Sequence, residues 1–251
     1  MHTLIQKKLK EIEEEKEVKI LFACESGSRA WGFPSPDSDY DVRFIYVRPI
    51  DWHLSLTAKK DTIDLPINDE LDIGGWELKK ACQLLKKSNA PLIEWLGSPI
   101  IYQKEAGFLH QFKRLSHGFF SAISVMHHYL SMSKKYIEAC QGEEIKLKRY
   151  FYALRTTVAA RWIREKQMMP PTDFTLMLKE LDHEVQELIQ SLIDLKAGKG
   201  EGYVHQQESK ILHFLESETA LNEQAANSLP SARGNIKGLD ELFRKTVKSV
   251  S

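Results

Sequence analysis

Segments that resemble β-strands are confined to the chain before Ile101, and this confinement restricts the possible folds more than any other feature. Apolar runs rich in β-forming residues occupy 18–25 and 39–47, and shorter ones occupy 61–67 and 70–75. Beyond Ile101 the apolar residues recur at helical spacing instead. The pattern predicts an α+β protein in which a small mixed sheet is followed by an all-helical part.

The predicted elements suggest two domains, a sheet domain over 1–104 and a helical domain over 105–251. A turn at Asn68–Asp69 is expected to separate two of the strands. Pro170 and Pro171 are expected to end one of the long helices. The helical spacing predicts helices at 3–16, 77–87, 105–141, 145–168, 173–196 and 203–219.

Composition excludes several classes of protein. The chain has 251 residues and a formal net charge of zero, so it lacks the global basic field that binds nucleic acid non-specifically. Cys24, Cys82 and Cys140 are widely spaced, and we interpret them as buried thiols rather than as a disulfide framework or a zinc site. No apolar run is long enough to span a bilayer, which predicts a cytoplasmic protein without a membrane partner.

Two carboxylates lie two residues apart where the strand predicted at 39–47 begins. Successive side chains of a strand point to opposite faces, so Asp39 and Asp41 are expected to share a face. Like charges held close together repel unless a cation lies between them. Magnesium suits such a pair, because it prefers oxygen ligands and keeps positions for water and phosphate. The pair predicts a magnesium site, with Asp37 of the preceding loop in a lesser role.

Gly27 and Ser28 follow the first predicted strand, and a proline-containing loop at 32–38 separates them from the two aspartates. A glycine at such a bend lets backbone N–H groups approach a phosphate, and the serine hydroxyl can donate a further hydrogen bond. Taken singly, these features are also compatible with a plain turn and a solvated Asp-x-Asp pair. Together they predict a bound nucleoside triphosphate, joined to the carboxylates by two magnesium ions or by manganese.

Longer segments resemble a known family. GSRAWG (27–32), SDYDVRF (38–44), LDIGGWELKK (71–80) and SNAPLIEWLGSPIIY (88–102) are similar to one branch of the DNA polymerase beta nucleotidyltransferase superfamily. That branch consists of predicted bacterial and phage nucleotidyltransferases, some of them associated with RNA repair. The resemblance implies transfer of a nucleoside monophosphate from a triphosphate to an acceptor hydroxyl.

The resemblance also implies a third carboxylate on a neighbouring strand, which would help to deprotonate the incoming hydroxyl. Asp72, just before the glycine pair at 74–75, is the preferred candidate, and Asp64 is the alternative. Asp39, Asp41 and Asp72 are then the expected catalytic and metal-binding residues.

Basic side chains are expected to complete the nucleotide site, whose predicted members are Gly27, Ser28, Arg29, Arg43, Lys80 and Arg155. The planar guanidinium of Arg29 suits a phosphate. Arg43 shares the parity of the aspartates, so it either faces the same cleft or pairs with a carboxylate and fixes the site. The resemblance makes Lys80 a phosphate candidate, against a solvated helix face. Arg155 borders an apolar helix stripe and would reach the triphosphate, an RNA end or a domain interface.

The leading hypothesis is therefore a magnesium-dependent nucleotidyltransferase. Its acceptor would be an RNA 3′ end, a protein side chain or a small molecule, and only the resemblance favours RNA. A non-catalytic nucleotide-binding protein of regulatory or antitoxin type is the alternative from another class. Protein AMPylation is a third hypothesis. Trp31, in the loop between the two motifs, is either a packing residue or a wall of the nucleotide cleft.

Overall fold

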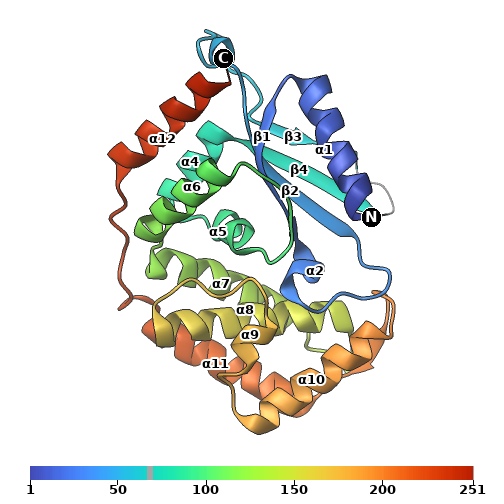
Figure 1. Cartoon of the computed structure of the whole chain (residues 1–251). Coiled ribbons are helices and arrows are strands. Elements are labelled where there is room, and N and C mark those ends of the chain that lie inside the picture. The colour runs from blue at the N-terminus through green and yellow to red at the C-terminus, as the bar shows by residue number, and fades with distance from the viewer. Residues whose placement is uncertain (67–69, 251) are drawn as a thin grey trace. The chain divides into compact units, whose positions relative to one another are not determined.

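The computed structural model describes residues 1–66 and 70–250, and it confirms the α+β class (Figure 1). A five-stranded mixed sheet belongs to the N-terminal part, and the part beyond it is largely helical. The turn predicted at Asn68–Asp69 lies outside the described residues. The strands are β1 (Lys19–Ser26), β2 (Tyr40–Val47), β3 (Thr62–Asp64), β4 (Leu71–Glu77), β5 (Ile101–Lys104), β6 (Glu144–Lys146) and β7 (Val204–Gln206).

Helices occur along the described chain, from α1 before the first strand to α12 near the C-terminus. Within residues 1–66 and 70–250, no helix is both long enough and apolar enough to cross a membrane. The helices are α1 (His2–Lys16), α2 (Gly27–Trp31), α3 (Ile50–His53), α4 (Leu78–Lys86), α5 (Ala90–Gly97), α6 (Ala106–Phe119), α7 (Ala122–Glu138), α8 (Leu147–Lys166), α9 (Thr175–Leu178), α10 (His183–Ala197), α11 (Ser209–Ala226) and α12 (Ile236–Ser249).

The chain divides into two compact units, and each unit is assembled from separated stretches of sequence. The predicted domain limits, 1–104 and 105–251, stay a prediction. The compact units differ from them because the loop 31–38 belongs to the second unit and the C-terminal helix belongs to the first. The sheet unit consists of Met1–Ala30, Asp39–Phe119 and Arg233–Ser251, and the helical unit consists of Trp31–Ser38 and Phe120–Ala232.

Strand pairing in the sheet unit determines which side chains become neighbours. The strand order is β3-β4-β2-β1-β5, with β2 and β4 parallel and the other neighbouring strands antiparallel. Asp41 on β2 lies opposite Asp72 on β4, and on its other side it lies opposite Ser26 on β1. The two aspartates are therefore side by side near the starts of two parallel strands.

The sheet unit has an apolar core to which the strands and α1 contribute. Side chains at alternate positions of β2 pack against the apolar stripe of α1. Helix α4 contacts β2 and β4, and α5 and α6 contact β1 (Figure 1). Each large apolar side chain that becomes fully buried contributes about 1.5–3 kcal/mol. Fully or almost fully buried members of this core are Ile5, Leu9, Ile12, Val42, Phe44, Tyr46 and Ile73.

The helical unit corrects several predicted boundaries. The helix predicted over 105–141 is interrupted at residues 120–121, because Ser121 accepts a hydrogen bond from the Ser124 N–H and caps a new helix, α7. The helix predicted over 173–196 is likewise split into α9 and α10. The unit also contains the short antiparallel pair β6–β7, which the sequence did not predict. A three-residue strand carries too little periodicity to be recognised.

Glu77, where β4 meets α4, is a fully buried carboxylate. One oxygen accepts the Lys79 N–H at 2.6 Å, and the other lies 3.8 Å from His53 Nε2. Burial raises the pKa of Glu77 to about 7, against the opposing effect of backbone hydrogen bonds from Lys79 and Leu78. Burial also lowers the pKa of His53.

The Glu77 shift predicts one contribution to the pH dependence of stability, and the lowered pKa of His53 acts in the opposite direction. Because the folded state retains the Glu77 proton up to about pH 7 and the unfolded state releases it near 4.5, stability falls as pH rises across this window. The free energy of unfolding is expected to fall by about 3 kcal/mol across this window. Glu77→Gln is expected to remove this decline in urea unfolding measured from pH 5 to 7.5, and Asp51→Asn, at an exposed position, serves as the control. The same decline in Glu77→Gln as in the native protein would contradict the assignment.

Candidate functional site

Asp41 lies directly against the bend formed by Gly27. Gly27 follows β1 as the first residue of α2 and has a φ of +65°, in the left-handed region that favours glycine. A Cβ atom at this position would lie 1.9 Å from Asp41 Oδ2 and 2.8 Å from its Cγ. Only the absence of a side chain lets the carboxylate approach the bend so closely. The structure therefore brings together two of the predicted motifs, and Ser28 follows in the first turn of α2.

Arg43 links the carboxylates of two strands. Its Nη2 donates to Asp72 Oδ2 at 2.6 Å and to Asp41 Oδ1 at 3.2 Å, while Nη1 donates to the Asp72 carbonyl oxygen at 2.9 Å. All three side chains are between a fifth and a third exposed, so the cluster is partly open to solvent. The sequence left two roles open for Arg43, and in the structure Arg43 forms ion pairs with the carboxylates of Asp41 and Asp72.

Asp64 lies one strand further out and has other partners. Asp64 pairs with Gly74 in the sheet, and its carboxylate accepts from the Thr62 hydroxyl at 3.0 Å and pairs with Lys60 at 3.1 Å. Its side chain is 60% exposed, twice the exposure of Asp72. The geometry places Asp72, not Asp64, beside Asp41.

Asp39 and Arg29 lie at the entrance to β2. Asp39 precedes the strand and is exposed, and its carbonyl oxygen accepts a hydrogen bond from Arg29 Nε at 3.2 Å. The Arg29 guanidinium carbon lies 3.8 Å from the centre of the Tyr40 ring. Such a cation–π contact contributes about 0.5–1 kcal/mol at an exposed position. Arg29 thus ties the segment after Gly27 to the segment that carries both aspartates.

Glu25 supports the site from within the sheet, and sequence reasoning gave it no role. Its side chain is fully buried; Oε1 accepts the Asp41 N–H at 2.8 Å, and Oε2 accepts the Tyr102 hydroxyl. Burial raises the pKa of Glu25, and the hydrogen bonds from Tyr102 and Asp41 oppose that rise. The signal available in the sequence was a lone acidic residue ending an apolar strand.

Lys80 is not part of this cluster, and Arg155 belongs to the other compact unit. Lys80 lies beyond the far end of β4, where its ammonium pairs with Asp61 at 2.9 Å. Arg155, 3% exposed on α8 of the helical unit, stacks its guanidinium 4.0 Å from the centre of the Trp31 ring. Trp31 is itself 9% exposed, as expected for the packing role that the sequence allowed.

The loop between the two motifs is held by the helical unit. Phe33 stacks on Phe151 with ring centres 4.8 Å apart, and the buried ammonium of Lys196 donates to the Ser35 hydroxyl at 2.7 Å. The carboxylate of Asp37 accepts the Glu201 N–H at 2.9 Å. Asp37 therefore anchors the loop within the helical unit.

A divalent cation was predicted at the aspartates, and the donor set has the required chemistry. Among the described residues, no group of three or more His, Cys, Asp or Glu side chains is arranged as a ready metal site. Asp41 and Asp72 nevertheless converge on one positive group, the Arg43 guanidinium, which occupies the place of a cation between them. Carboxylate oxygens from adjacent strands are ligands that magnesium accepts, and Arg43 would have to turn aside to admit it.

The mixed sheet and its paired carboxylates agree with a polymerase beta-like nucleotidyltransferase, the class that the sequence resembles. Residues 1–245 match the profile of the RNA repair pathway DNA polymerase beta family, RlaP, and the chain belongs to this family. Enzymes of the wider superfamily generally use divalent metals, and the family implies a nucleotide substrate.

Two individual proteins are similar to this chain. The uncharacterized protein YcgL of Bacillus subtilis (strain 168) is 41% identical over 247 residues, which are 96% of this chain and 95% of that protein. A crystal structure of a nucleotidyltransferase-like protein from Exiguobacterium sibiricum 255-15 aligns over 96% of this chain and 80% of its own, with 10% identity and a TM-score of 0.30. A score this low carries no argument about function.

Proposed function

We propose that the protein is a metal-dependent nucleotidyltransferase that moves a nucleoside monophosphate from a nucleoside triphosphate to an acceptor hydroxyl, with an RNA end as the preferred acceptor. The observation that carries the proposal is the convergence of Asp41 and Asp72, on adjacent parallel strands, beside a bend at which a Cβ atom would overlap the Asp41 carboxylate. The family's RNA repair context supports the choice of acceptor.

Each residue of the cluster has a distinct proposed role. Asp39 and Asp41 hold the metal, and Asp72 helps to remove the proton of the attacking hydroxyl. A bound divalent ion would neutralise phosphate charge and lower the pKa of the attacking group. The Gly27–Ser28 bend donates hydrogen bonds to the triphosphate, and Glu25 keeps the Asp41 backbone in place through its N–H.

Arg43 is proposed to act as a counter-ion for the carboxylates of Asp41 and Asp72. In the absence of ligand it neutralises two carboxylates that would otherwise repel each other. The Arg43 guanidinium would be available to the triphosphate, whose oxygens its planar fork suits, if a metal held by the aspartates neutralised their charge instead. Arg29, tied to the Asp39 carbonyl oxygen, is proposed as a second phosphate contact.

The test is an assay with each of four labelled nucleoside triphosphates, magnesium, and either mixed RNA or bulk protein as acceptor. Labelled RNA supports the proposal, labelled protein would replace it with AMPylation or a related protein modification, and nucleotide binding without any product would favour the non-catalytic alternative. Omitting magnesium, and replacing it with manganese, tests the metal.

The matched pair Asp72→Asn and Asp64→Asn tests the third carboxylate. We expect Asp72→Asn to lower the transfer rate by at least about tenfold, because Asp72 adjoins Asp41, and Asp64→Asn to change it by less than about twofold. The rates are compared at saturating triphosphate, with thermal melting as the check on folding. The reverse order of effects would transfer the role to Asp64.

A further inference from the structure

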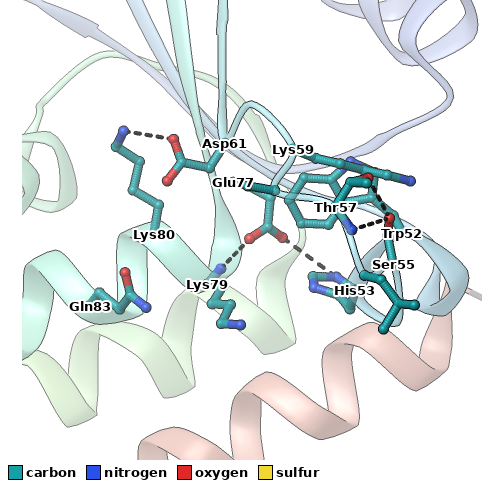
Figure 2. A pocket seen from close by; sticks show the side chains of 12 residues that line it. Trp52, His53, Ser55, Thr57, Lys59, Asp61, Glu77, Lys79, Lys80 and Gln83 are labelled. Carbon is teal, nitrogen blue, oxygen red and sulfur yellow. Dashed lines mark hydrogen bonds and ion pairs between the residues drawn. The ribbon is translucent and has the colours of Figure 1, made fainter.

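A separate pocket of about 450 Å³ lies at the other end of the strands that carry the aspartates (Figure 2). Asp72 and Glu77 are five positions apart on β4, which at about 3.3 Å per residue separates them by about 17 Å. The volume is within the usual range for small-molecule sites, about 300–1,000 Å³. The pocket is therefore distinct from the candidate catalytic cluster and large enough for a ligand of its own.

Lysines give this pocket a positive character. Lys59, Lys79 and Lys80 line it, and Lys80 is already paired with Asp61. Within 1–66 and 70–250, no carboxylate forms an ion pair with Lys59 or Lys79. The other acidic residue of the lining, Glu77, is fully buried behind His53. Lys79 lowers the pKa of Glu77 through its charge, so its compensation is partial, and the excess of lysines over exposed carboxylates at the pocket favours an anionic ligand.

The remaining lining residues narrow the chemistry of that ligand. The hydroxyls of Ser55 and Thr57 are hydrogen-bonded to each other at 3.0 Å, which leaves one of the two hydroxyl protons, together with the amide of Gln83, to donate to phosphate oxygens. The indole of Trp52, half-buried beside His53, adds a flat apolar surface on which a planar ring can stack. The Glu77 oxygen beside His53 has no hydrogen-bond donor, so the floor also contains an unsatisfied acceptor.

We propose that this pocket is a second ligand site, specific for a nucleoside 5′-monophosphate, in which one of the two lysines that point apart in Figure 2, Lys59 or Lys79, binds the phosphate and Trp52 contacts the base. Binding here requires no nucleotidyl transfer, so the inference does not depend on the proposed function.

The test is calorimetric titration of the full-length protein with each nucleoside 5′-monophosphate, and separately with inorganic phosphate, without divalent metal. The double variant Lys59→Met/Lys79→Met is expected to weaken monophosphate binding at least tenfold. The matched control Lys86→Met/Lys87→Met removes the same charge from the exposed end of α4 and is expected to bind normally. Lys59→Arg/Lys79→Arg is expected to restore most of the affinity.

Asp41→Asn separates this proposal from the proposed function. Monophosphate binding that survives Asp41→Asn but is lost in the lysine variant supports a second site. The proposal would be overturned by no saturable binding up to millimolar monophosphate, by binding lost in Asp41→Asn, or by equal affinity in the two double lysine-to-methionine variants. Inorganic phosphate that binds as tightly as the monophosphates would also overturn it, because the site would then recognise an anion only.

Discussion

Asp41→Asn is expected to lower nucleotidyl transfer by at least about a thousandfold, which corresponds to about 4 kcal/mol of transition-state stabilisation. Asp41 is the carboxylate that contacts both the Gly27 bend and Arg43, so it links the phosphate-binding and metal-binding parts of the proposed site. The substitution keeps the size of the side chain and removes its charge. Steady-state transfer to RNA, measured over a range of magnesium concentrations, checks the prediction.

The control for this experiment is Asp51→Asn, an identical change at an exposed position of α3. It is expected to leave transfer unchanged. Asp41→Asn should melt within a few degrees of the native protein, because its carboxylate is partly exposed and its backbone N–H still reaches Glu25. A variant that keeps more than a tenth of the native rate would remove Asp41 from the metal site.

Gly27→Ala is expected to reduce transfer by at least about a hundredfold, since displacing a reacting group by about 1 Å can cost that much. The added methyl group would overlap Asp41 Oδ2, so the carboxylate must leave its position. The left-handed backbone at Gly27 adds a conformational cost of about 1–2 kcal/mol for any other residue. Transfer kinetics and urea unfolding measure the two effects separately.

Gly202→Ala is the matched control, because a Cβ at Gly202 would meet nothing within 4 Å. It should change neither the rate nor the stability by a measurable amount. If Gly27→Ala lost stability but kept its rate, the bend would be a purely structural element. If it kept both, the close approach of Asp41 to Gly27 would be wrong.

The sheet and the pair of motifs were predictable because their signals are local. Alternating apolar residues specify β2, and a glycine followed by a serine after an apolar run specifies a bend. The prediction that Asp72 lies beside Asp41 came from family resemblance, and the parallel register of β2 and β4 provides its geometry. Their catalytic roles remain predictions that the experiments above address.

The features that sequence reasoning missed all depend on contacts between distant parts of the chain. Glu25 receives its hydrogen bond from Tyr102, which is 77 positions away. The final helix α12 packs on α4 and α6, and the amino-acid composition of α12 does not predict which helices it contacts. Lys80 has suitable charge and spacing for a phosphate contact, but it lies beyond the opposite end of β4 from Asp72.

The placement of residues 31–38 matters for anyone who wishes to study the catalytic part alone. A fragment ending at residue 104 would retain both motifs but would strip the connecting loop of its partners Phe151 and Lys196, leaving Phe33 facing water. It would also lack α6 and α12. A shortened protein of this kind would be prone to aggregate, and its inactivity would say nothing about the chemistry of the intact chain.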